Sequence, residues 1–338
     1  MQKIKILLGS YIDGSVAQDV NCYHIAKYLD KAKFEVHALT HGGKIDLPDV
    51  ICHKISENAI LKNIEKALVM LSVKADVYYL PRVERADVWF AKMTSRVTVS
   101  SVEIQTIYDS EKMRRFFTRD ISGYFCISDF LNRLNIEKWG ESAPVLYLGT
   151  DSVPGAFIHK EVARIAYVAG FFPRKRPELF LEVAKMFPDV DFVMIGDGPL
   201  LDKIKTAASA LPAHNVSFTG RLSNPDAISQ LKSSDLLLVT SRQEGLPKVI
   251  LEAASQGVPS IYINKHYQVD YIENGVNGYA VSGKTEMADV IRRLRSDSGE
   301  YRRVSEGAIK TAKEYQWGRL ISGYEEFFEN YAGQSVRS

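Results

Sequence analysis

The sequence predicts an α/β protein with two doubly wound domains, each built on a parallel sheet. Short apolar segments alternate with helical segments along the whole chain, a pattern typical of parallel sheets covered by helices. The length of 338 residues favours two domains, each large enough to bury its own core. No segment repeats with a period of about 20–50 residues, which argues against a solenoid.

The composition is that of an ordinary globular protein without a global charge for binding nucleic acid. Charged residues make up 25% and hydrophobic residues 46% of the chain, and the formal net charge is +2. Cys22, Cys52 and Cys126 lie far apart without a CxxC pair, so we expect buried free thiols in a reducing compartment. The N-terminus lacks a signal-peptide pattern, and no apolar run approaches the roughly 20 residues of a membrane helix. We therefore expect a cytoplasmic protein.

The first half of the chain contains the strands of the predicted N-terminal domain. A helix is predicted over Ala17–Lys31, after the first strand. We expect the strands at Lys3–Gly9, Phe34–Thr40, Val77–Leu80, Val97–Ser101, Gly123–Ser128 and Pro144–Leu148.

The turn after the first strand is a candidate ligand loop. Its sequence, G-S-Y-I-D-G, lacks GxGxxG, which weakens a redox dinucleotide interpretation. Gly9, Ser10 and Gly14 would form a flexible loop at the carboxyl end of the strand, where open α/β sheets place ligands. A plain strand–helix connector is an equally good interpretation of each residue.

Segment Lys112–Arg119, KMRRFFTR, mixes four basic residues with two phenylalanines. One interpretation is a helix with a solvated basic face and a buried aromatic face. The other is a contact with anionic lipid head groups, since basic and aromatic amphipathic helices lie at membrane surfaces. Both interpretations stay open.

The second half of the chain repeats the alternation of strands and helices. Helices are expected at Glu286–Arg295, at about Glu300–Glu314 and at Trp317–Tyr331, whose aromatic residues have the spacing of core side chains. We expect the strands at Arg164–Ala169, Asp191–Gly198 with its turn, Val216–Arg221, Asp235–Thr240, Val258–Ile263 and Tyr279–Val281.

The most informative stretch is Ser241–Gly257, SRQEGLPKVILEAASQG, which predicts a loop followed by a helix. Pro247 suits the first helical position, and Gly257 suits the left-handed position just past the helix end. A helix N-terminus behind a glycine-containing loop attracts phosphate, because its N–H groups are unpaired and its dipole is positive there. Glu244 and Glu252 flank this site, although an ordinary strand–loop–helix unit with two solvated carboxylates would have the same geometry.

The residues E-G-L-P-x-V-x-L-E-A, followed by G-V-P, resemble the E-x7-E signature of retaining glycosyltransferases with the GT-B fold, family 4 in particular. The resemblance is strong from about residue 144 to 282 and weak before that. It implies two Rossmann-like domains facing across a cleft, with the last helix crossing back to the first domain. It also implies that Glu244 holds the donor sugar and Glu252 the ribose. The backbone amides around Gly245, Leu246 and Pro247 would face the diphosphate.

A second resemblance lies in Tyr167–Glu182, where Gly170 forms a turn and Arg174, Lys175 and Arg176 precede a helix. Lys175 aligns with the phosphate-binding lysine of the family. The family usually has an arginine a few residues earlier, where this chain has Phe171 and Phe172. Arg174 or Arg176 is expected to compensate.

Other parts of the donor site follow from the same resemblance. Gly196 belongs to the family's "viGdGp" stretch, and Gly220 with Arg221 is expected near the nucleotide base. Asp189 and Asp191 spell the DxD metal motif of a different glycosyltransferase fold. They lie at the N-terminal entrance of the strand, at the edge of an α/β sheet that does not bind ligands, so we predict no metal.

The chain departs from the family at two places. Many members have a histidine after the strand that corresponds to Val97–Ser101, where this chain reads TVSSVEI; His41 and His24 are the candidates to replace it. Asn264–Asp270 also replaces a glycine-rich loop, which could mark an altered donor pocket.

The resemblance therefore implies a retaining, metal-independent glycosyltransferase that uses a nucleoside-diphosphate sugar as co-substrate and needs no cofactor. Residues 1–155 would bind a saccharide or lipid-linked acceptor, residues 156–315 the donor, and residues 316–338 would pack back on the first domain. Cell-surface polysaccharide or glycoconjugate synthesis is expected, with peripheral contact at the inner face of the membrane. The alternatives are a non-catalytic GT-B binding or partner subunit and a nucleotide-sugar 2-epimerase.

Overall fold

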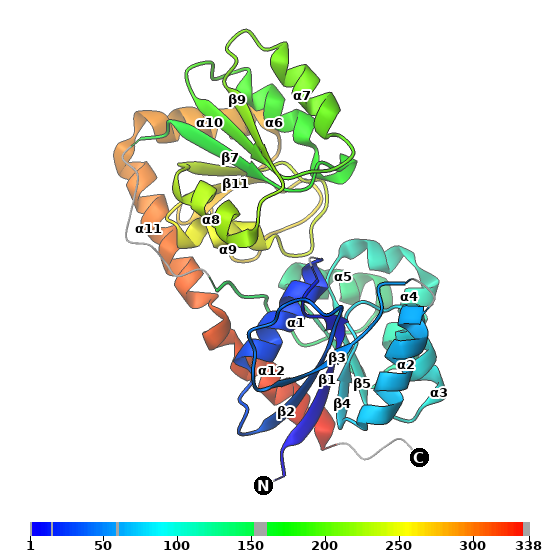
Figure 1. Cartoon of the computed structure of the whole chain (residues 1–338). Helices are drawn as coiled ribbons and strands as arrows, with labels where there is room; N and C mark the ends of the chain where they lie inside the picture. Colours follow the sequence, from blue (N-terminus) through cyan, green and yellow to red (C-terminus); the bar gives the residue numbers. More distant parts are fainter. Residues whose placement is uncertain (1, 15, 59–60, 152–160, 334–338) are drawn as a thin grey trace. The chain divides into compact units, whose positions relative to one another are not determined.

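The computed structural model describes residues 2–14, 16–58, 61–151 and 161–333 (Figure 1). The chain forms two compact units, an N-terminal unit of Met1–Leu148 with Trp317–Ser338, and a C-terminal unit of Gly149–Gln316. The linker expected at Ser152–Glu161 lies outside the described residues, apart from Glu161. Within the part of the chain that the structure describes, no helix is long and apolar enough to cross a membrane.

The N-terminal unit contains a parallel sheet of six strands in the order β3-β2-β1-β4-β5-β6. Its strands are β1 (Ile4–Tyr11), β2 (Phe34–Thr40), β3 (Val50–Lys54), β4 (Val77–Tyr79), β5 (Thr98–Val102) and β6 (Gly123–Cys126).

Two strand assignments in this unit differ from the sequence prediction. The sequence analysis missed β3, an edge strand in which only Val50 is buried, so its apolar signal is weak. The strand expected at Pro144–Leu148 is reduced to one isolated bridge between Val145 and Cys126. Pro144 has no N–H to donate, which limits the pairing of this segment.

Helices cover both faces of this sheet (Figure 1). They are α1 (Ala17–Tyr28), α2 (Leu61–Val73), α3 (Arg85–Met93), α4 (Glu111–Arg115), α5 (Asp129–Trp139) and α12 (Trp317–Ala332), with the short turns η1 (Gln105–Asp109) and η2 (Phe116–Asp120). Tyr78 and Tyr79 are consecutive in β4 and therefore point to opposite faces. Tyr78 packs on Phe90 of α3 with 4.6 Å between ring centroids, and Tyr79 packs on Phe328 of α12 at 5.8 Å. The last helix thus returns to the first sheet, as predicted.

The C-terminal unit has a second parallel sheet of six strands, in the order β12-β11-β10-β7-β8-β9. The strands are β7 (Arg164–Val168), β8 (Asp191–Ile195), β9 (Val216–Gly220), β10 (Leu236–Val239), β11 (Ser260–Ile263) and β12 (Gly278–Val281). The helices are α6 (Pro177–Ala184), α7 (Leu201–Ser209), α8 (Asn224–Lys232), α9 (Lys248–Ser255), α10 (Lys284–Ser296) and α11 (Ser298–Glu314), with the 3₁₀ turn η3 (Pro173–Lys175).

Both units therefore have the Rossmann-like, doubly wound arrangement that the family resemblance implies. The first strand of each unit lies between the second and the fourth, so the strand order reverses between β1 and β4 and between β7 and β10. Ligands of open α/β sheets bind outside the carboxyl ends of the strands at such a switch point. The loops that follow these four strands are accordingly the first places to search for a site.

Candidate functional site

In the C-terminal unit, hydrogen bonds to backbone carbonyls join the loops after β7 and β10. The Arg242 N–H donates to the Arg174 carbonyl at 2.7 Å, and the Thr240 hydroxyl donates to the Lys175 carbonyl at 2.8 Å. The Arg176 backbone has φ of +50° and precedes α6, which turns the chain sharply from the basic loop into the helix. Two segments distant in sequence are thus held at one switch point.

This arrangement brings Lys175 and Glu244 into direct contact. The Lys175 ammonium donates to Glu244 Oε1, and a guanidinium nitrogen of Arg174 lies 3.7 Å from Glu244 Oε2. The Glu244 side chain is 10% exposed, against 18% for Lys175 and 48% for Arg174. The two cations therefore surround a mostly buried carboxylate and remain reachable from solvent, as a site for an anionic ligand requires.

Arg176 lies elsewhere. It lines a cavity of about 460 Å³ with Arg242 and Lys265, together with Pro173, Glu178, His266, Ser282 and Gly283. Of the two arginines expected to complete the phosphate site, the structure places Arg174 beside Lys175 and Glu244.

Helix α9 begins at Lys248, one residue later than predicted, and Pro247 is its N-cap residue. The Pro247 carbonyl accepts a hydrogen bond from the Tyr271 hydroxyl at 2.9 Å, which anchors the start of the helix. Gly257 has φ of +76° just past the helix end, as predicted. Glu252 Oε1 accepts from the Asn224 side-chain amide at 3.0 Å, so Glu252 faces the start of α8, shortly after Gly220 and Arg221 in the chain.

Three glycines shape the turns at the carboxyl ends of β7, β8 and β9. Gly196 has φ of +138°, and a Cβ there would lie 2.1 Å from the Ala169 carbonyl oxygen. The Gly196 N–H donates to the Gly220 carbonyl at 2.9 Å, and Gly220 has φ of +73°. Gly170 lies in the turn after β7, where its carbonyl accepts from the Tyr167 hydroxyl at 3.4 Å. These close backbone approaches leave no space for larger residues at position 196.

Tyr267 was not singled out by the sequence analysis. It lies in Asn264–Asp270, is 2% exposed, and its hydroxyl has no hydrogen-bond partner among the residues that the structure describes. Burial and the nearby charge of Glu244 raise its pKa well above the usual range of tyrosine. The only signal in the sequence was the departure of this loop from the family pattern.

The DxD residues lie away from this site. β8 begins at Asp191, and Asp189 forms an ion pair with Arg295 at 2.5 Å, which lowers the pKa of Asp189. Among the described residues, no group of three or more His, Cys, Asp or Glu side chains could hold a metal ion.

In the N-terminal unit, the prediction that Gly9, Ser10 and Gly14 form one loop is wrong. Gly9 and Ser10 belong to β1, which continues to Tyr11. A Cβ on Gly9 would lie 2.3 Å from Leu80 Cδ2, so this glycine allows close packing between strands. The buried Ser10 hydroxyl donates to Asp19 at 2.5 Å, and Gly14 follows the strand in the turn, where its N–H donates to the Tyr11 carbonyl at 2.8 Å.

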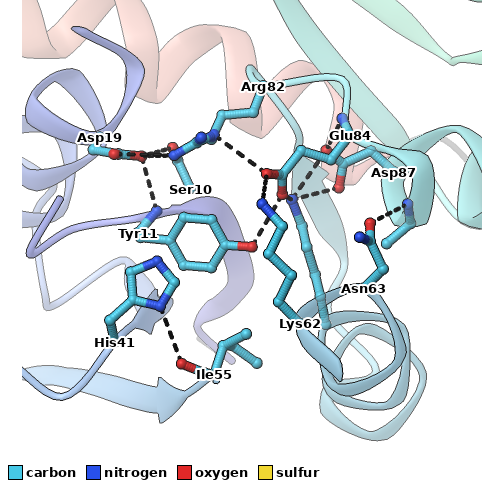
Figure 2. A network of polar contacts seen from close by, with 12 residues as sticks. Ser10, Tyr11, Asp19, His41, Ile55, Lys62, Asn63, Arg82, Glu84 and Asp87 are labelled. Carbon is cyan, nitrogen blue, oxygen red and sulfur yellow. Dashed lines mark hydrogen bonds and ion pairs between the residues drawn. The ribbon is translucent and has the colours of Figure 1, made fainter. Parts of the chain in front are cut away.

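A polar network does gather at this switch point, which we call the Glu84 cluster: Tyr11, Lys62, Lys66, Arg82, Glu84 and Asp87 (Figure 2). The Tyr11 hydroxyl donates to Glu84 at 3.0 Å. The Lys66 ammonium, which is fully buried, lies 2.9 Å from Glu84 and 2.8 Å from Asp87. Arg82 binds Asp19 at 2.9 Å and so links the cluster to Ser10.

The cluster changes the ionisation of its members. Burial opposes the charge of Glu84, but Lys66, Lys62 and Arg82 outweigh it and lower the pKa of Glu84 to about 2. Burial, together with the charge of Glu84, raises the pKa of Tyr11 far above its usual range. Sequence reasoning missed this cluster; its one local signal is the E-x-x-D pattern that caps α3, in which the side chains of Glu84 and Asp87 bond each other's backbone.

The structure separates the two candidate histidines. His41 stacks on Tyr11 with 4.1 Å between ring centroids, beside the Glu84 cluster (Figure 2). His24 stacks on Trp317 at 5.5 Å, between α1 and α12. At the end of β5, the Ser101 hydroxyl donates to Glu103 at 2.9 Å.

The structure also tests the predictions made for the three cysteines and for the segment Lys112–Arg119. Cys22 and Cys126 are buried free thiols, but Cys52 is exposed because β3 is an edge strand. In Lys112–Arg119, Phe116 and Phe117 are buried, and Phe117 packs on Trp139. This segment therefore has the solvated basic face with buried aromatic residues that was the first interpretation.

The C-terminal unit, which holds Lys175, Glu244 and Glu252, is also the part of the chain that matches a known family. Residues 154–311 match the model of the glycosyl transferases group 1. This unit belongs to that family.

Several proteins are similar in sequence to this chain. An uncharacterized glycosyltransferase of Methanocaldococcus jannaschii is 22% identical over 245 residues, which is 69% of this chain and 67% of the relative. Spore coat protein SA of Bacillus subtilis is 25% identical over 88% of this chain and 84% of its own length. N-acetyl-alpha-D-glucosaminyl L-malate synthase of Bacillus anthracis is 29% identical over 48% of this chain, and the match spans only 44% of that relative.

Solved structures share the whole fold. Anabaena HepE, crystallised with UDP, has a TM-score of 0.79 at 16% identity and covers 97% of this chain and 100% of its own. Sucrose-phosphate synthase of Thermosynechococcus elongatus has a TM-score of 0.80 at 13% identity and covers 98% and 99%. At these identities the likeness concerns the fold.

Proposed function

We propose that this group 1 glycosyltransferase is a retaining, metal-independent enzyme that transfers a sugar from a nucleoside-diphosphate sugar to an acceptor hydroxyl. The observation that carries the proposal is the contact of Lys175 with Glu244 at the switch point, with Arg174 beside it. Two cations lie there, and α9 begins four residues after Glu244, a combination that suits a diphosphate. The donor therefore binds to the C-terminal unit and the acceptor to the N-terminal unit.

Each donor residue has a role in this proposal. Lys175 and Arg174 bind the diphosphate, while Glu244 orients Lys175 and accepts hydrogen bonds from sugar hydroxyls. Glu252 accepts hydrogen bonds from the ribose in place of the Asn224 amide. Gly220 and Arg221 flank the base. UDP is the first nucleotide to test, since structures of the similar Anabaena protein contain UDP or UDP-glucose.

The reaction breaks the bond between the sugar C1 and a diphosphate oxygen, and forms a bond from C1 to the acceptor oxygen on the same face. The acceptor proton passes to the leaving phosphate oxygen, so no external base is required. Lys175 and Arg174 stabilise the negative charge that develops on the diphosphate, which is usually the largest catalytic contribution of preorganised groups. Cell-surface polysaccharide or glycoconjugate synthesis is the proposed setting.

Calorimetric binding of UDP, GDP and ADP tests the donor site. We expect one nucleotide to bind wild type and Glu252→Ala to bind it at least about tenfold more weakly, because charged hydrogen bonds contribute about 1.5–3 kcal/mol. Lys175→Met should mainly lower kcat for sugar transfer, by about 10²–10³-fold, since it removes charge stabilisation at the leaving group. Normal nucleotide binding by Glu252→Ala would contradict the ribose assignment.

A non-catalytic binding subunit is the second candidate. It is favoured by the sequence at the end of β5, where Ser101 and Glu103 stand in place of the family histidine. Nucleotide binding without sugar transfer, and without slow hydrolysis of the donor, would favour this candidate. Transfer with retention of the anomeric configuration, followed by NMR, would exclude it.

A further inference from the structure

The cavity of about 460 Å³ in the C-terminal unit is lined mainly by basic side chains, and we call it the Arg242 pocket. Arg176, Arg242, Lys265 and His266 line it, whereas Glu178 is the one carboxylate among its described lining residues. Its volume is within the range of about 300–1,000 Å³ that is usual for small-molecule sites. A cavity of this size with an excess of positive charge suits a small anionic ligand.

The cations of the Arg242 pocket are not neutralised within the described part of the chain. No carboxylate among the described residues forms an ion pair with Arg176, Arg242 or Lys265. Glu286 of the neighbouring helix α10 instead accepts hydrogen bonds from the backbone N–H and the hydroxyl of Ser282, each at 2.8 Å. Like charges that share a cavity repel one another, so a bound anion would relieve this repulsion.

The backbone of Arg176 is in an unusual conformation at the edge of this pocket. Its φ of +50° and ψ of +54° lie in the left-handed region, which residues other than glycine rarely adopt. The Thr240 hydroxyl donates to the Arg176 carbonyl at 3.0 Å and helps to hold this conformation. Glycine would adopt it without strain, so an arginine at this position indicates a use for the side chain.

The pocket and the proposed diphosphate site share the loops after β7 and β10 but not their side chains. Lys175 contacts Glu244, whereas Arg176, the next residue, lines the pocket. Arg242 precedes Glu244 by two residues and also lines the pocket. The loop after β11 contributes Lys265. A ligand in the pocket would therefore bind beside the donor diphosphate without taking its cations.

We propose that the Arg242 pocket is a second anion site, which binds the carboxylate or phosphate group of a charged sugar. The guanidinium groups of Arg176 and Arg242 can each bind such a group through two parallel hydrogen bonds, and Lys265 adds a third positive charge. The charged sugar is either the sugar of the donor, if that sugar is a uronic acid, or a free sugar phosphate or sugar acid. The first source rests on the proposed function, and the second does not.

Titration calorimetry with free charged sugars tests the pocket. We expect glucose 6-phosphate or glucuronate to bind wild type at one site, with or without saturating UDP, and glucose not to bind. Arg242→Gln should weaken this binding by at least about tenfold, because it removes charged hydrogen bonds. Arg176→Gly should weaken it similarly without loss of stability, since glycine adopts positive φ freely.

The matched control is Arg303→Gln. Arg303 is an exposed arginine of α11 that forms no ion pair with a described carboxylate, so this variant should bind the charged sugars as wild type does. Arg242 likewise has no such partner, so thermal melting of Arg242→Gln should match that of wild type. Weaker binding by Arg242→Gln at an unchanged midpoint then reports on the pocket and not on the fold.

A comparison of nucleotide sugars identifies the source of the charge. If the donor supplies it, UDP-glucuronate should bind wild type at least about tenfold more tightly than UDP-glucose, and Arg242→Gln should abolish this preference while UDP still binds. If a free sugar supplies it, the two nucleotide sugars should bind alike, and only glucose 6-phosphate or glucuronate should depend on Arg242.

Three outcomes would overturn the proposal. The first is wild type that binds no charged sugar, free or nucleotide-linked, more tightly than its neutral counterpart. The second is a preference that Arg242→Gln and Arg176→Gly both retain. The third is free glucose 6-phosphate that UDP displaces and Lys175→Met no longer binds, which would assign the anion to the diphosphate site. Failure of UDP, GDP and ADP to bind would contradict the proposed function alone, because the free sugars still test the pocket.

Discussion

Glu84→Gln tests whether the Glu84 cluster stabilises the N-terminal unit through the ionised carboxylate. Folding lowers the pKa of Glu84 from 4.5 to about 2. At about 1.4 kcal/mol per pH unit, this shift corresponds to at most about 3.5 kcal/mol of stability at neutral pH. The side chain is 14% exposed and water screens its ion pairs, so we expect about 2 kcal/mol.

The pH dependence of this stability contribution follows from the linkage between proton binding and folding. A carboxyl whose pKa is lowered on folding stabilises the folded state above its unfolded pKa, and this contribution is lost as the pH falls from about 4.5 through about 2. Wild type should therefore exceed Glu84→Gln by about 2 kcal/mol at pH 7 and by about 1 kcal/mol near pH 3.5. The substitution keeps the size of the side chain and an oxygen that can accept the capping hydrogen bond.

Hydrogen exchange is the appropriate assay, because two compact units can unfold separately and a single global transition would then be hard to interpret. Peptides that cover α2 and α3 report the opening free energy of the N-terminal unit. The matched control is Glu137→Gln, which removes a carboxylate that is 63% exposed. An equal difference between wild type and Glu84→Gln at both pH values would refute the reasoning.

Two further predictions concern the C-terminal unit. Tyr267→Phe should leave the thermal midpoint unchanged or raise it, because a buried hydroxyl without a partner among the described residues costs about 1–3 kcal/mol; its control is Tyr262→Phe, which removes the acceptor of the Val269 N–H and should lower the midpoint. A fall with Tyr267→Phe would show that its hydroxyl is paired. Gly196→Ala should destabilise the unit by more than about 3 kcal/mol, because positive φ adds to a Cβ placed 2.1 Å from a carbonyl oxygen. Gly220→Ala has positive φ but open space, so urea denaturation should show a loss of only about 1–2 kcal/mol, and equal losses for the two variants would contradict this account.

Local patterns in the sequence were sufficient for most strands and helices. Phe34–Thr40 is both the predicted and the observed strand β2, and Trp317–Tyr331 was predicted one residue short of α12. The errors fall where the local signal is weak or misleading. β3 is an exposed edge strand with little apolar patterning, and the glycine at position 9 is used for close packing inside β1.

The α/β class, the family resemblance and the strand–loop–helix around Glu244 could all be predicted from the sequence, because they depend on residue spacing within one segment. Which distant segments contact one another could be seen only in the tertiary structure. Lys175 and Glu244 are 69 positions apart, and the strand order places their loops side by side between β7 and β10. The Glu84 cluster likewise joins β1, α2 and the start of α3, which have no shared local pattern. Strand order results from packing over the whole domain, so the partners of buried charges appear only once the sheet is assembled.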